Sequence, residues 1–507
     1  MTFRSILFAE QPDHPSSSQP AFFVDLNLDQ LVSAATTGRE QYQLEAYYYE
    51  RLRNLQLIHY RQDVVHDLQV SDLSAAIDRF AETMRAVRER LTQAGKLRYP
   101  YQQQSLVLAA AQLYVQAVSD LAADPALKQA TSQGFRDLHT YLQEYVTSES
   151  FTAFVTEGRA VQDALAGLTY CLLIDGSRIT VSRYDGQADY SVQVEDTFAK
   201  FKQGAVKDYR ASIPDYLEMN HVEGQILDLV ARLYPDTFAA LTAFHTRYPS
   251  FIDETIALFD RQVQFYVGYL RVTGRLQANG LNFCRPNISE DSKNVNAIGT
   301  FDLVLADKLL DTEKRVVTND FSLTGPERFF VVSGMNQGGK TTFARAFGQL
   351  HYLAGLGLPV PAVSADVYVP DEIFTHFERE EDPAALHGKL EDDLLRIHEV
   401  LDKATHHSIV IMNELFSSTT LADAITLGTL VLGELIERDC LGVCVTFVDE
   451  LSRLGDATVS LVSAVNPADP AARTFKLERR PADGLSSALV LAEKYGLTYA
   501  RLATEVG

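Results

Sequence analysis

The sequence has few cysteines and fewer basic residues than acidic ones. Four of the 507 residues are cysteines, and 45 basic residues stand against 67 acidic ones, for a formal net charge of −22. The cysteines are too few for a disulfide framework and lack zinc-ligand spacing, so we expect reduced thiols; they are Cys171, Cys284, Cys440 and Cys444. The acidic balance disfavours a generally basic nucleic-acid binder, although one local basic face would suffice for contact with DNA.

Long apolar runs are also missing. The sequence indicates no apolar run of the roughly 20 residues that a membrane-spanning helix needs. The first 20 residues end in a Pro/Ser-rich stretch and do not have the form of a signal peptide. We therefore expect a cytoplasmic protein. Its length exceeds that of one ordinary core, which predicts two or three domains.

What the sequence does contain is a glycine-rich loop motif. Gly334, Gly339, Lys340 and Thr341 occupy every fixed position of the phosphate-loop pattern G-x-x-x-x-G-K-[ST]. The apolar run 329–332 just before it predicts a buried parallel strand, and apolar residues at helical spacing just after it predict a helix. The alternative is a glycine-rich turn with a chance lysine, which this strand–loop–helix context disfavours.

The residue types of the motif suit a polyphosphate ligand. Glycines allow backbone N–H groups to turn inward, and the positive end of the following helix favours negative charge. Lys340 supplies a mobile positive charge, and the Thr341 hydroxyl is a candidate Mg²⁺ ligand. The predicted nucleotide-binding residues are Gly334, Met335, Asn336, Gln337, Gly338, Gly339, Lys340, Thr341 and Thr342.

A second predicted core strand, 408–414, ends in the polar pair Asn413 and Glu414. A strand in this place usually delivers an Asp to the Mg²⁺ shell and then a Glu that polarises the attacking water. Asn413 keeps the size of Asp but loses its charge, so we expect Thr341 and Asn413 to form a weakened metal site. Glu414 is the predicted catalytic base; the alternative is a surface glutamate at a strand end.

Four side-chain hydroxyls follow, directly before a predicted helix at 421–436. They belong to Ser417, Ser418, Thr419 and Thr420. A helix cap would account for one or two of them. Four in a row predict a loop that reads phosphate on a neighbouring subunit. A third core strand is predicted at 442–447.

The region upstream of the motif is mostly helical by its spacing. A heptad stripe predicts a long helix packed along another; its residues are Leu73, Ile77, Phe80, Met84, Val87 and Leu91. Residues 168–194 interrupt the helices with three predicted strands and Asp-Gly turns. A locally basic stretch comes next, and it is either a solvated face or a contact with the DNA backbone. Its residues are Lys200, Lys202, Lys207 and Arg210.

Together these segments resemble the MutS family of DNA mismatch-repair ATPases. The loop at 334–342 is similar to the family's G-P-N-M-G-G-K-S-T, and residues 413–420 occupy the place of its D-E-x-G-R-G-T-S. Further similarity lies at 317–320, at Asp371-Glu-Ile-Phe-Thr375, at Lys494-Tyr-Gly-Leu497 and at 47–68. The resemblance covers most of the chain and is strongest over 300–500.

The resemblance implies an ATPase that binds ATP and Mg²⁺ and forms a homodimer through this domain. The hydroxyl loop of one subunit would complete the site of the other, and ATP would drive helical levers into or out of a clamp around DNA. The predicted fold has a flexible arm at 1–20 and a mainly α-helical core and lever domain at 21–298, with its β insertion at about 168–194. An α/β P-loop NTPase domain of the ABC type follows at 299–507.

Departures from the family pattern modify these expectations. About 20 residues precede the helical core, so we expect no mismatch-reading domain. Asn413 replaces the metal-binding Asp, and Phe447 stands where the family has a His that helps to position the attacking water, so we expect slow hydrolysis. The predicted function is an ATP-gated dimeric clamp on DNA, in repair or recombination. The alternative is a nucleotide-gated protein-interaction module with little hydrolysis and no DNA binding.

Overall fold

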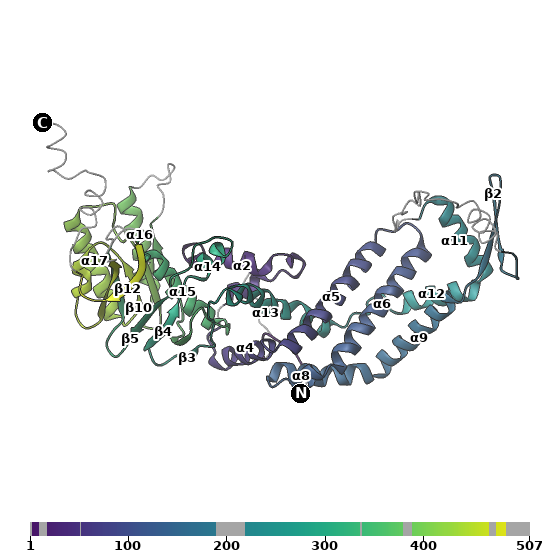
Figure 1. The fold of residues 1–507 in the computed structure, drawn as a ribbon, viewed down its shortest axis with the longest axis horizontal. Helices are drawn as coiled ribbons and strands as arrows, with labels where there is room; N and C mark the ends of the chain where they lie inside the picture. The colour runs from purple at the N-terminus through teal and green to yellow at the C-terminus, as the bar shows by residue number, and fades with distance from the viewer. Residues whose placement is uncertain are drawn as a thin grey trace, which may run out of the picture. The chain divides into compact units, whose positions relative to one another are not determined.

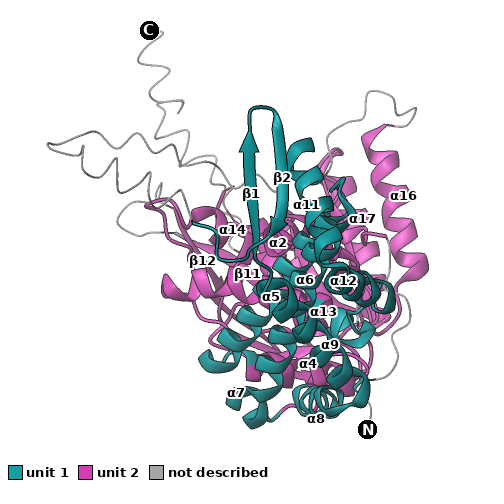
Figure 2. Cartoon of the chain, turned by 90° about the vertical axis from the view of Figure 1, so that its right-hand side faces the viewer, with its two compact units in different colours: residues 1–3, 68–131, 135–260 teal, residues 4–67, 132–134, 261–507 magenta. Residues whose placement is uncertain are grey.

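The computed structural model describes residues 3–9, 18–50, 52–188, 219–334, 337–378, 388–465 and 473–482 (Figure 1). Several predicted features lie outside these residues: Met335, Asn336, the third strand at 190–194, the basic residues 200–210 and the segment 494–497. The chain forms two compact units (Figure 2). The helical unit consists of 1–3, 68–131 and 135–260; the sheet unit consists of 4–67, 132–134 and 261–507.

These units differ from the predicted division at 298/299. The helices near the N-terminus belong to the sheet unit because their backbone accepts hydrogen bonds from residues far along the chain. Tyr352 Oη donates to Tyr48 O over 2.5 Å, and Gln349 Nε2 donates to Leu26 O over 3.0 Å. Such contacts join segments about 300 residues apart, which local periodicity does not reveal.

Helices make up most of the helical unit. In order they are α5 (Ser71–Ala94), α6 (Pro100–Ala123), α7 (Pro125–Gln129), α8 (Gln133–Thr147), α9 (Glu149–Ala166), α11 (His221–Leu233) and α12 (Pro235–Arg247). The predicted heptad stripe lies on α5, where Leu73 through Val87 of the stripe are buried, and α5 packs along α6. The prediction of two long helices packed lengthwise is therefore confirmed.

One feature of α6 contradicts the reading that no apolar run is long enough for a membrane. Among the described residues, the helical segment 100–129 is long and apolar enough to cross a membrane, by length and composition alone. In the helical unit, α6 contacts α5, α9 and α12, and it buries Leu108, Tyr114 and Val118 among its apolar residues. Helix packing therefore accounts for this composition.

Two of the three predicted strands form a hairpin after α9. Strand β1 (Tyr170–Asp175) pairs antiparallel with β2 (Arg178–Arg183), and Asp175 stands opposite Arg178 at the turn. Gly176 has φ +57°, the left-handed conformation that the Asp-Gly signal predicts. The side chains of Leu173 and Ile174 are 62% and 67% exposed, so the hairpin presents apolar surface.

The first residues of the chain are anchored, in contrast to the predicted flexible arm. Ile6 and Leu7 are fully buried. Ser5 Oγ donates to Gln262 Oε1 over 2.7 Å, and Arg61 Nε donates to Leu7 O over 3.0 Å. The prediction of an arm is therefore wrong for residues 4–8, because side chains distant in sequence hold this segment.

The helices of the sheet unit before its first strand are α1 (Phe22–Asp25), α2 (Leu28–Thr36), α3 (Glu45–Tyr49), α4 (Leu55–Leu68) and α13 (Glu254–Ala278), with a 3₁₀ turn η1 (Glu40–Tyr42). The later helices are α14 (Leu303–Leu309), α15 (Lys340–Gly355), α16 (Lys389–Lys403) and α17 (Leu421–Glu437), with a 3₁₀ turn η2 (Asp449–Arg453). The predicted helix at 421–436 is thus observed within one residue.

Two sheets form the centre of this unit. The larger has the order β12-β11-β6-β10-β9-β8 and is parallel except for β12. Its strands are β6 (Phe329–Ser333), β8 (Ile373–Phe377), β9 (Ile409–Asn413), β10 (Leu441–Val445), β11 (Thr458–Val465) and β12 (Arg473–Arg479). The smaller sheet, β3-β7-β4-β5, comprises β3 (Asn287–Ser289), β4 (Val295–Thr300), β5 (Asn319–Leu323) and β7 (Ser364–Tyr368).

Apolar side chains cover both faces of the larger sheet. Phe330 of β6 meets Phe343 and Phe347 of α15, with ring centroids 5.6 and 6.1 Å apart. Phe329 and Val331, which alternate with Phe330, belong to the buried cluster that includes residues of α16 and α17. The strands at 329–332, 408–414 and 442–447 were predicted from their apolar runs, and each core strand is observed with shifts of up to two residues at its ends.

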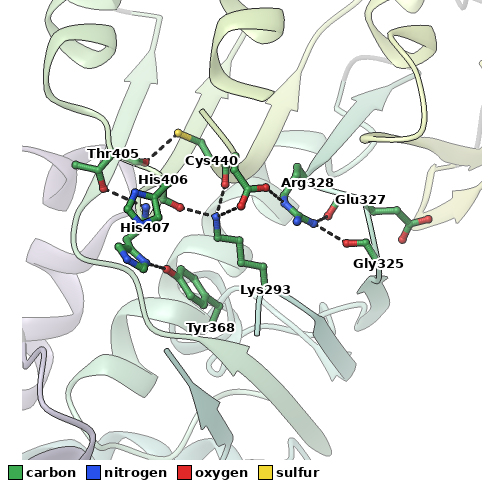
Figure 3. Close-up of polar contacts among 10 residues, drawn as sticks. Lys293, Gly325, Glu327, Arg328, Tyr368, Thr405, His406, His407 and Cys440 are labelled. Atoms are coloured by element: carbon green, nitrogen blue, oxygen red, sulfur yellow. Dashed lines mark hydrogen bonds and ion pairs between the residues drawn. The ribbon is translucent and has the colours of Figure 1, made fainter. Parts of the chain in front are cut away.

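A charged cluster joins the two sheets at the amino ends of the parallel strands (Figure 3). Lys293 Nζ donates over 2.5 Å to His406 O, to Asp439 O and to Asp439 Oδ2. Arg328 Nε donates to the other carboxylate oxygen of Asp439. Burial acts to raise the pKa of Asp439, but the hydrogen bonds from Lys293 and Arg328 outweigh it, so the pKa is lowered. The cluster therefore fixes the loop between β3 and β4 to the segments that start β9 and β10.

Buried His351 makes the stability of the fold depend on pH. The ring lies on α15, fully buried, with Nδ1 2.7 Å from Tyr368 O. Since a carbonyl only accepts, Nδ1 carries the proton. Burial lowers the pKa of His351 to about 4. The unfolded chain binds this proton more readily than the native chain does, so the stabilising contribution is present above the unfolded pKa of about 6.5 and is lost as pH falls toward 4.

We predict that the free energy of unfolding falls by about 3 kcal/mol on account of His351 between pH 6.5 and pH 4. His351→Asn retains a donor near Nδ1 and removes the titrating ring, so it should flatten this part of the profile while costing some packing. Urea unfolding at a series of pH values measures the effect. His398→Asn, at a side chain 70% exposed, is the control. Equal slopes in wild type and His351→Asn would contradict the prediction.

Candidate functional site

The glycine-rich loop lies at the carboxyl end of β6 and leads into α15. Gly334 and Gly339 have φ +112° and +95°, a region that side chains with a Cβ rarely adopt. A Cβ on Gly334 would also lie 2.3 Å from Ser463 Oγ on β11. Both glycines are therefore required by the backbone conformation, and Gly334 also by the neighbouring strand.

Lys340 begins α15 and is largely buried at the loop. Its Nζ donates to Gly334 O over 2.8 Å, so the side chain folds back over the loop. Burial lowers the pKa of Lys340, the charge of Arg473 lowers it further, and the carboxylate of Glu414 opposes both. The ammonium group is thus a partly desolvated charge at the start of a helix, where an anion is favoured.

The end of β9 brings the predicted polar pair beside this loop. Thr341 Oγ1 donates to Asn413 Oδ1 over 2.8 Å. Glu414 follows with φ +61°, and its backbone N–H donates to Val445 O over 2.9 Å. Sequence reasoning paired Thr341 with Asn413, and the structure brings these two side chains together.

This pair suits a magnesium ion in its ligand type. A hydroxyl and an amide oxygen are hard oxygen donors, and Mg²⁺ takes few protein ligands while keeping several waters. Among the described residues there is no group of three or more His, Cys, Asp or Glu side chains placed to hold a metal. Thr341 and Asn413 are the residues that would hold the ion, together with phosphate oxygens and water.

Glu414 has a neighbour that the sequence did not identify. Glu378, just after β8, shares a side-chain hydrogen bond with Glu414 and pairs with Lys389 Nζ. Burial and this bond raise the pKa of Glu414, against the charges of Lys340 and Lys389. The hydrogen bond from Lys389 lowers the pKa of Glu378. Of the two carboxyl groups, Glu414 is therefore the one whose pKa is raised, and Glu378 is the one whose pKa is lowered.

The four hydroxyls at 417–420 have different partners. Ser417 Oγ donates to Glu378 Oε1 over 3.1 Å. Thr420 is the N-cap of α17: its Oγ1 accepts from Asp423 N over 3.2 Å and donates to Asp423 Oδ2 over 2.8 Å. Thr419 Oγ1 reaches the same carboxylate over 3.3 Å, and Ser418 is exposed. A helix cap thus accounts for Thr420, and Ser417 contacts Glu378, which is hydrogen-bonded to Glu414.

A cavity of about 1030 Å³ is lined by Gly339, Lys340, Thr341 and Glu414 of these groups. One part of its wall is charged and polar, with Gln337, Lys340, Thr341, Glu414 and Arg473. Another part comes from α14, the residues just before it and the segment before β5. It has apolar side chains, Phe301, Leu305, Leu309, Val316 and Val317, with the charged side chains of Asp302, Lys314 and Arg315 among them. A ligand with a polyphosphate at one end and a flat apolar group at the other fits this division.

The start of β12 is a wall of the cavity that sequence reasoning missed. Arg473, Thr474 and Phe475 line it. Asn319 holds this strand through two bonds: Nδ2 donates to Phe475 O over 3.1 Å, and Oδ1 accepts from Leu477 N over 2.8 Å. The element containing Asn319 was noted for its resemblance, but no local signal indicates its partner 156 residues away.

Phe447, the predicted substitute for a water-positioning His, lies just after β10. Its side chain is 55% exposed. Phenylalanine has no hydrogen-bonding group, so it cannot orient water by a hydrogen bond.

Comparisons with known proteins match the C-terminal part of the chain. Residues 330–505 match the family model of MutS domain V. The DNA mismatch repair protein MutS of Thermotoga neapolitana is 29% identical over 223 residues, which are 44% of this chain and 27% of that protein. MutS of Thermotoga maritima is 30% identical over 173 residues, 34% of this chain and 21% of that protein. MutS of Erythrobacter litoralis is 28% identical over 227 residues, 44% and 25% of the two chains. The matched region spans about a quarter of the length of these relatives.

We predict that Asn319→Ala loosens β12 and lowers the free energy of unfolding by about 2 kcal/mol, because two hydrogen bonds to backbone groups are lost. Urea unfolding measures the change. Asn296→Ala, at an exposed position of the neighbouring strand β4, should change stability by less than about 0.5 kcal/mol. If the two variants were equally stable, Asn319 would not hold β12.

Proposed function

Since the chain belongs to the MutS family through residues 330–505, we propose that its sheet unit is a P-loop ATPase domain of the ABC type. The observation that carries this proposal is one cavity lined by Lys340, Thr341 and Glu414, with Asn413 hydrogen-bonded to Thr341 at its edge. This group of side chains supports a phosphate site, a metal site and a water site close together. A glycine-rich turn without function would not require this set.

Each group of residues has its own role in the proposed hydrolysis of ATP. The amides of the glycine-rich loop and Lys340 bind the phosphates, and the apolar wall near Val316 and Val317 receives the base. Thr341 and Asn413 would hold Mg²⁺, which would supply positive charge to offset the charge of the phosphates. Glu414 orients a water and accepts its proton as the water oxygen bonds to the γ-phosphorus and the bond to the ADP oxygen breaks.

We further propose a homodimer that acts as an ATP-gated clamp on DNA in repair or recombination, in the cytoplasm. The names of the relatives, DNA mismatch repair protein MutS, support DNA as the partner. In the dimer, the hydroxyl loop at 417–420 serves the nucleotide of the partner subunit. Slow turnover is expected, because Asn413 is uncharged and Phe447 cannot hydrogen-bond water.

A second candidate is a nucleotide-gated protein-interaction module with little hydrolysis. Its support is the apolar hairpin β1–β2, whose Leu173 and Ile174 are mostly exposed, and the net charge of −22. Such a surface suits a protein partner better than a phosphate backbone, which requires basic side chains.

We predict that the purified protein hydrolyses ATP slowly and that one form of DNA stimulates it. Steady-state hydrolysis is measured alone and with duplex, branched and single-stranded DNA. Glu414→Ala should reduce kcat at least about a hundredfold, because a positioned base contributes this much or more. Glu399→Ala, at an exposed position of α16, is the matched control and should leave kcat unchanged.

The outcomes separate the two candidates. DNA-stimulated turnover that depends on Glu414 supports the clamp. Nucleotide binding without DNA-responsive turnover supports the interaction module. Absence of nucleotide binding in the wild type would refute both.

We predict that Asn413→Asp strengthens metal binding. The added negative charge, on a side chain of the same size, should lower the Mg²⁺ concentration for half-maximal ATP-dependent activity by about tenfold. A Mg²⁺ titration of the wild type and the variant measures this. Asn296→Asp adds the same charge at an exposed position and is the control. An unchanged Mg²⁺ requirement would remove Asn413 from the metal site.

A further inference from the structure

The first residues of β12 lie against the end of the glycine-rich loop. A Cβ placed on Gly339 would be 3.6 Å from Phe475 O and 3.7 Å from Phe475 Cα. Phe475 itself has φ +55°, a strained conformation for a bulky residue. Such strain persists where surrounding contacts impose it. The strand is therefore held close to the place where the loop becomes α15.

Several bonds impose this placement. Beside the two bonds from Asn319, Thr474 Oγ1 donates to Ala464 O over 2.6 Å, and Lys476 Nζ donates to Thr318 O. Val465 stands opposite Arg473 in the antiparallel pairing of β11 and β12. Backbone and side-chain bonds thus fix residues 473–477 of the strand.

Arg473 brings a positive charge from β12 to a cavity that Lys314, Arg315 and Lys340 also line. Its charge acts on Lys340 through space and lowers the pKa of that side chain. Positive charges gathered around one cavity favour an anion between them. Glu414 lines the cavity too, and its carboxyl group shares a hydrogen bond with Glu378.

We propose that Arg473 is a second phosphate-binding cation of the nucleotide site, supplied by β12 and not by the glycine-rich loop. The proposal rests on the proposed function, since it assigns Arg473 to the polyphosphate of the same nucleotide. A guanidinium group suits this role because its planar N–H groups donate two parallel hydrogen bonds to phosphate oxygens. Lys340 approaches the polyphosphate from the loop, and Arg473 approaches it from the strand.

The test compares nucleotide affinities of the full chain. Binding of Mg-ATP, ADP and AMP is measured by fluorescence titration of labelled nucleotides for the wild type, Arg473→Ala, Arg473→Lys and Arg473→Gln. Arg479→Ala is the matched control, because Arg479 lies at the far end of the same strand and pairs with Glu327. Thermal unfolding of each variant checks that β12 remains folded.

Arg473→Ala should weaken Mg-ATP binding about tenfold or more, since charge-assisted bonds to phosphate are lost. AMP binding should weaken much less. Arg473→Lys should retain part of the affinity, and added guanidinium ion should restore part of it to Arg473→Ala. If Arg473→Ala is too unstable to measure, the difference between Arg473→Lys and Arg473→Gln, which differ in charge at similar length, gives the answer.

Equal Mg-ATP affinities in wild type, Arg473→Ala and Arg479→Ala would overturn the assignment of Arg473 and leave the proposed ATPase intact. Equal losses for ATP and AMP, with no effect of guanidinium ion, would likewise assign Arg473 to the fold and not to phosphate. Failure of the wild type and Arg479→Ala to bind any of the three nucleotides would refute the proposed function, and the inference with it.

Discussion

The parallel register of β6, β10 and β9 is the constraint on which the site depends. Parallel strands end at the same edge of a sheet, so the loop after β6 and the polar pair after β9 meet although about 70 residues separate them. The contact between Thr341 and Asn413, 2.8 Å long, is the direct result. Two backbone bonds extend this register beyond the strands, from Thr446 to Val332 and from Glu414 to Val445. A shift of one strand by a residue would turn the polar pair to the other face.

The parts of the site that sequence predicts are those with a local signal. Gly339 and Lys340 sit in a pattern with fixed spacing, and Asn413 ends an apolar run that is a buried strand. Glu378 and Arg473 have no such signal, because their partners lie far along the chain and only the fold brings them together. The same reason explains the anchored N-terminal segment and the different division into units. Periodicity reports on burial within an element, and it does not report which elements pack together.

Glu378 gives the hydroxyl loop a connection to the proposed catalytic base. Ser417 donates its hydroxyl hydrogen to Glu378, and Glu378 shares a hydrogen bond with Glu414. A hydroxyl has one hydrogen to donate, so Ser417 cannot give it to a phosphate and to Glu378 at once. In the proposed dimer, engagement of the loop by a partner's nucleotide therefore changes the hydrogen bonds of Glu378. The loop and the base of one subunit are then coupled through a single carboxylate.

Two residues set the balance of charge in the proposed nucleotide site. Asn413 is uncharged at the proposed metal site, and Arg473 places a positive charge on the cavity proposed to receive the phosphates. In the proposed function, both shift the binding of the polyphosphate from the metal ion toward the protein. Attraction that is equal in the bound state and in the transition state strengthens binding without accelerating the reaction. In the proposed function, such a site would retain its nucleotide and turn it over slowly, as suits a clamp whose conformation depends on the bound nucleotide.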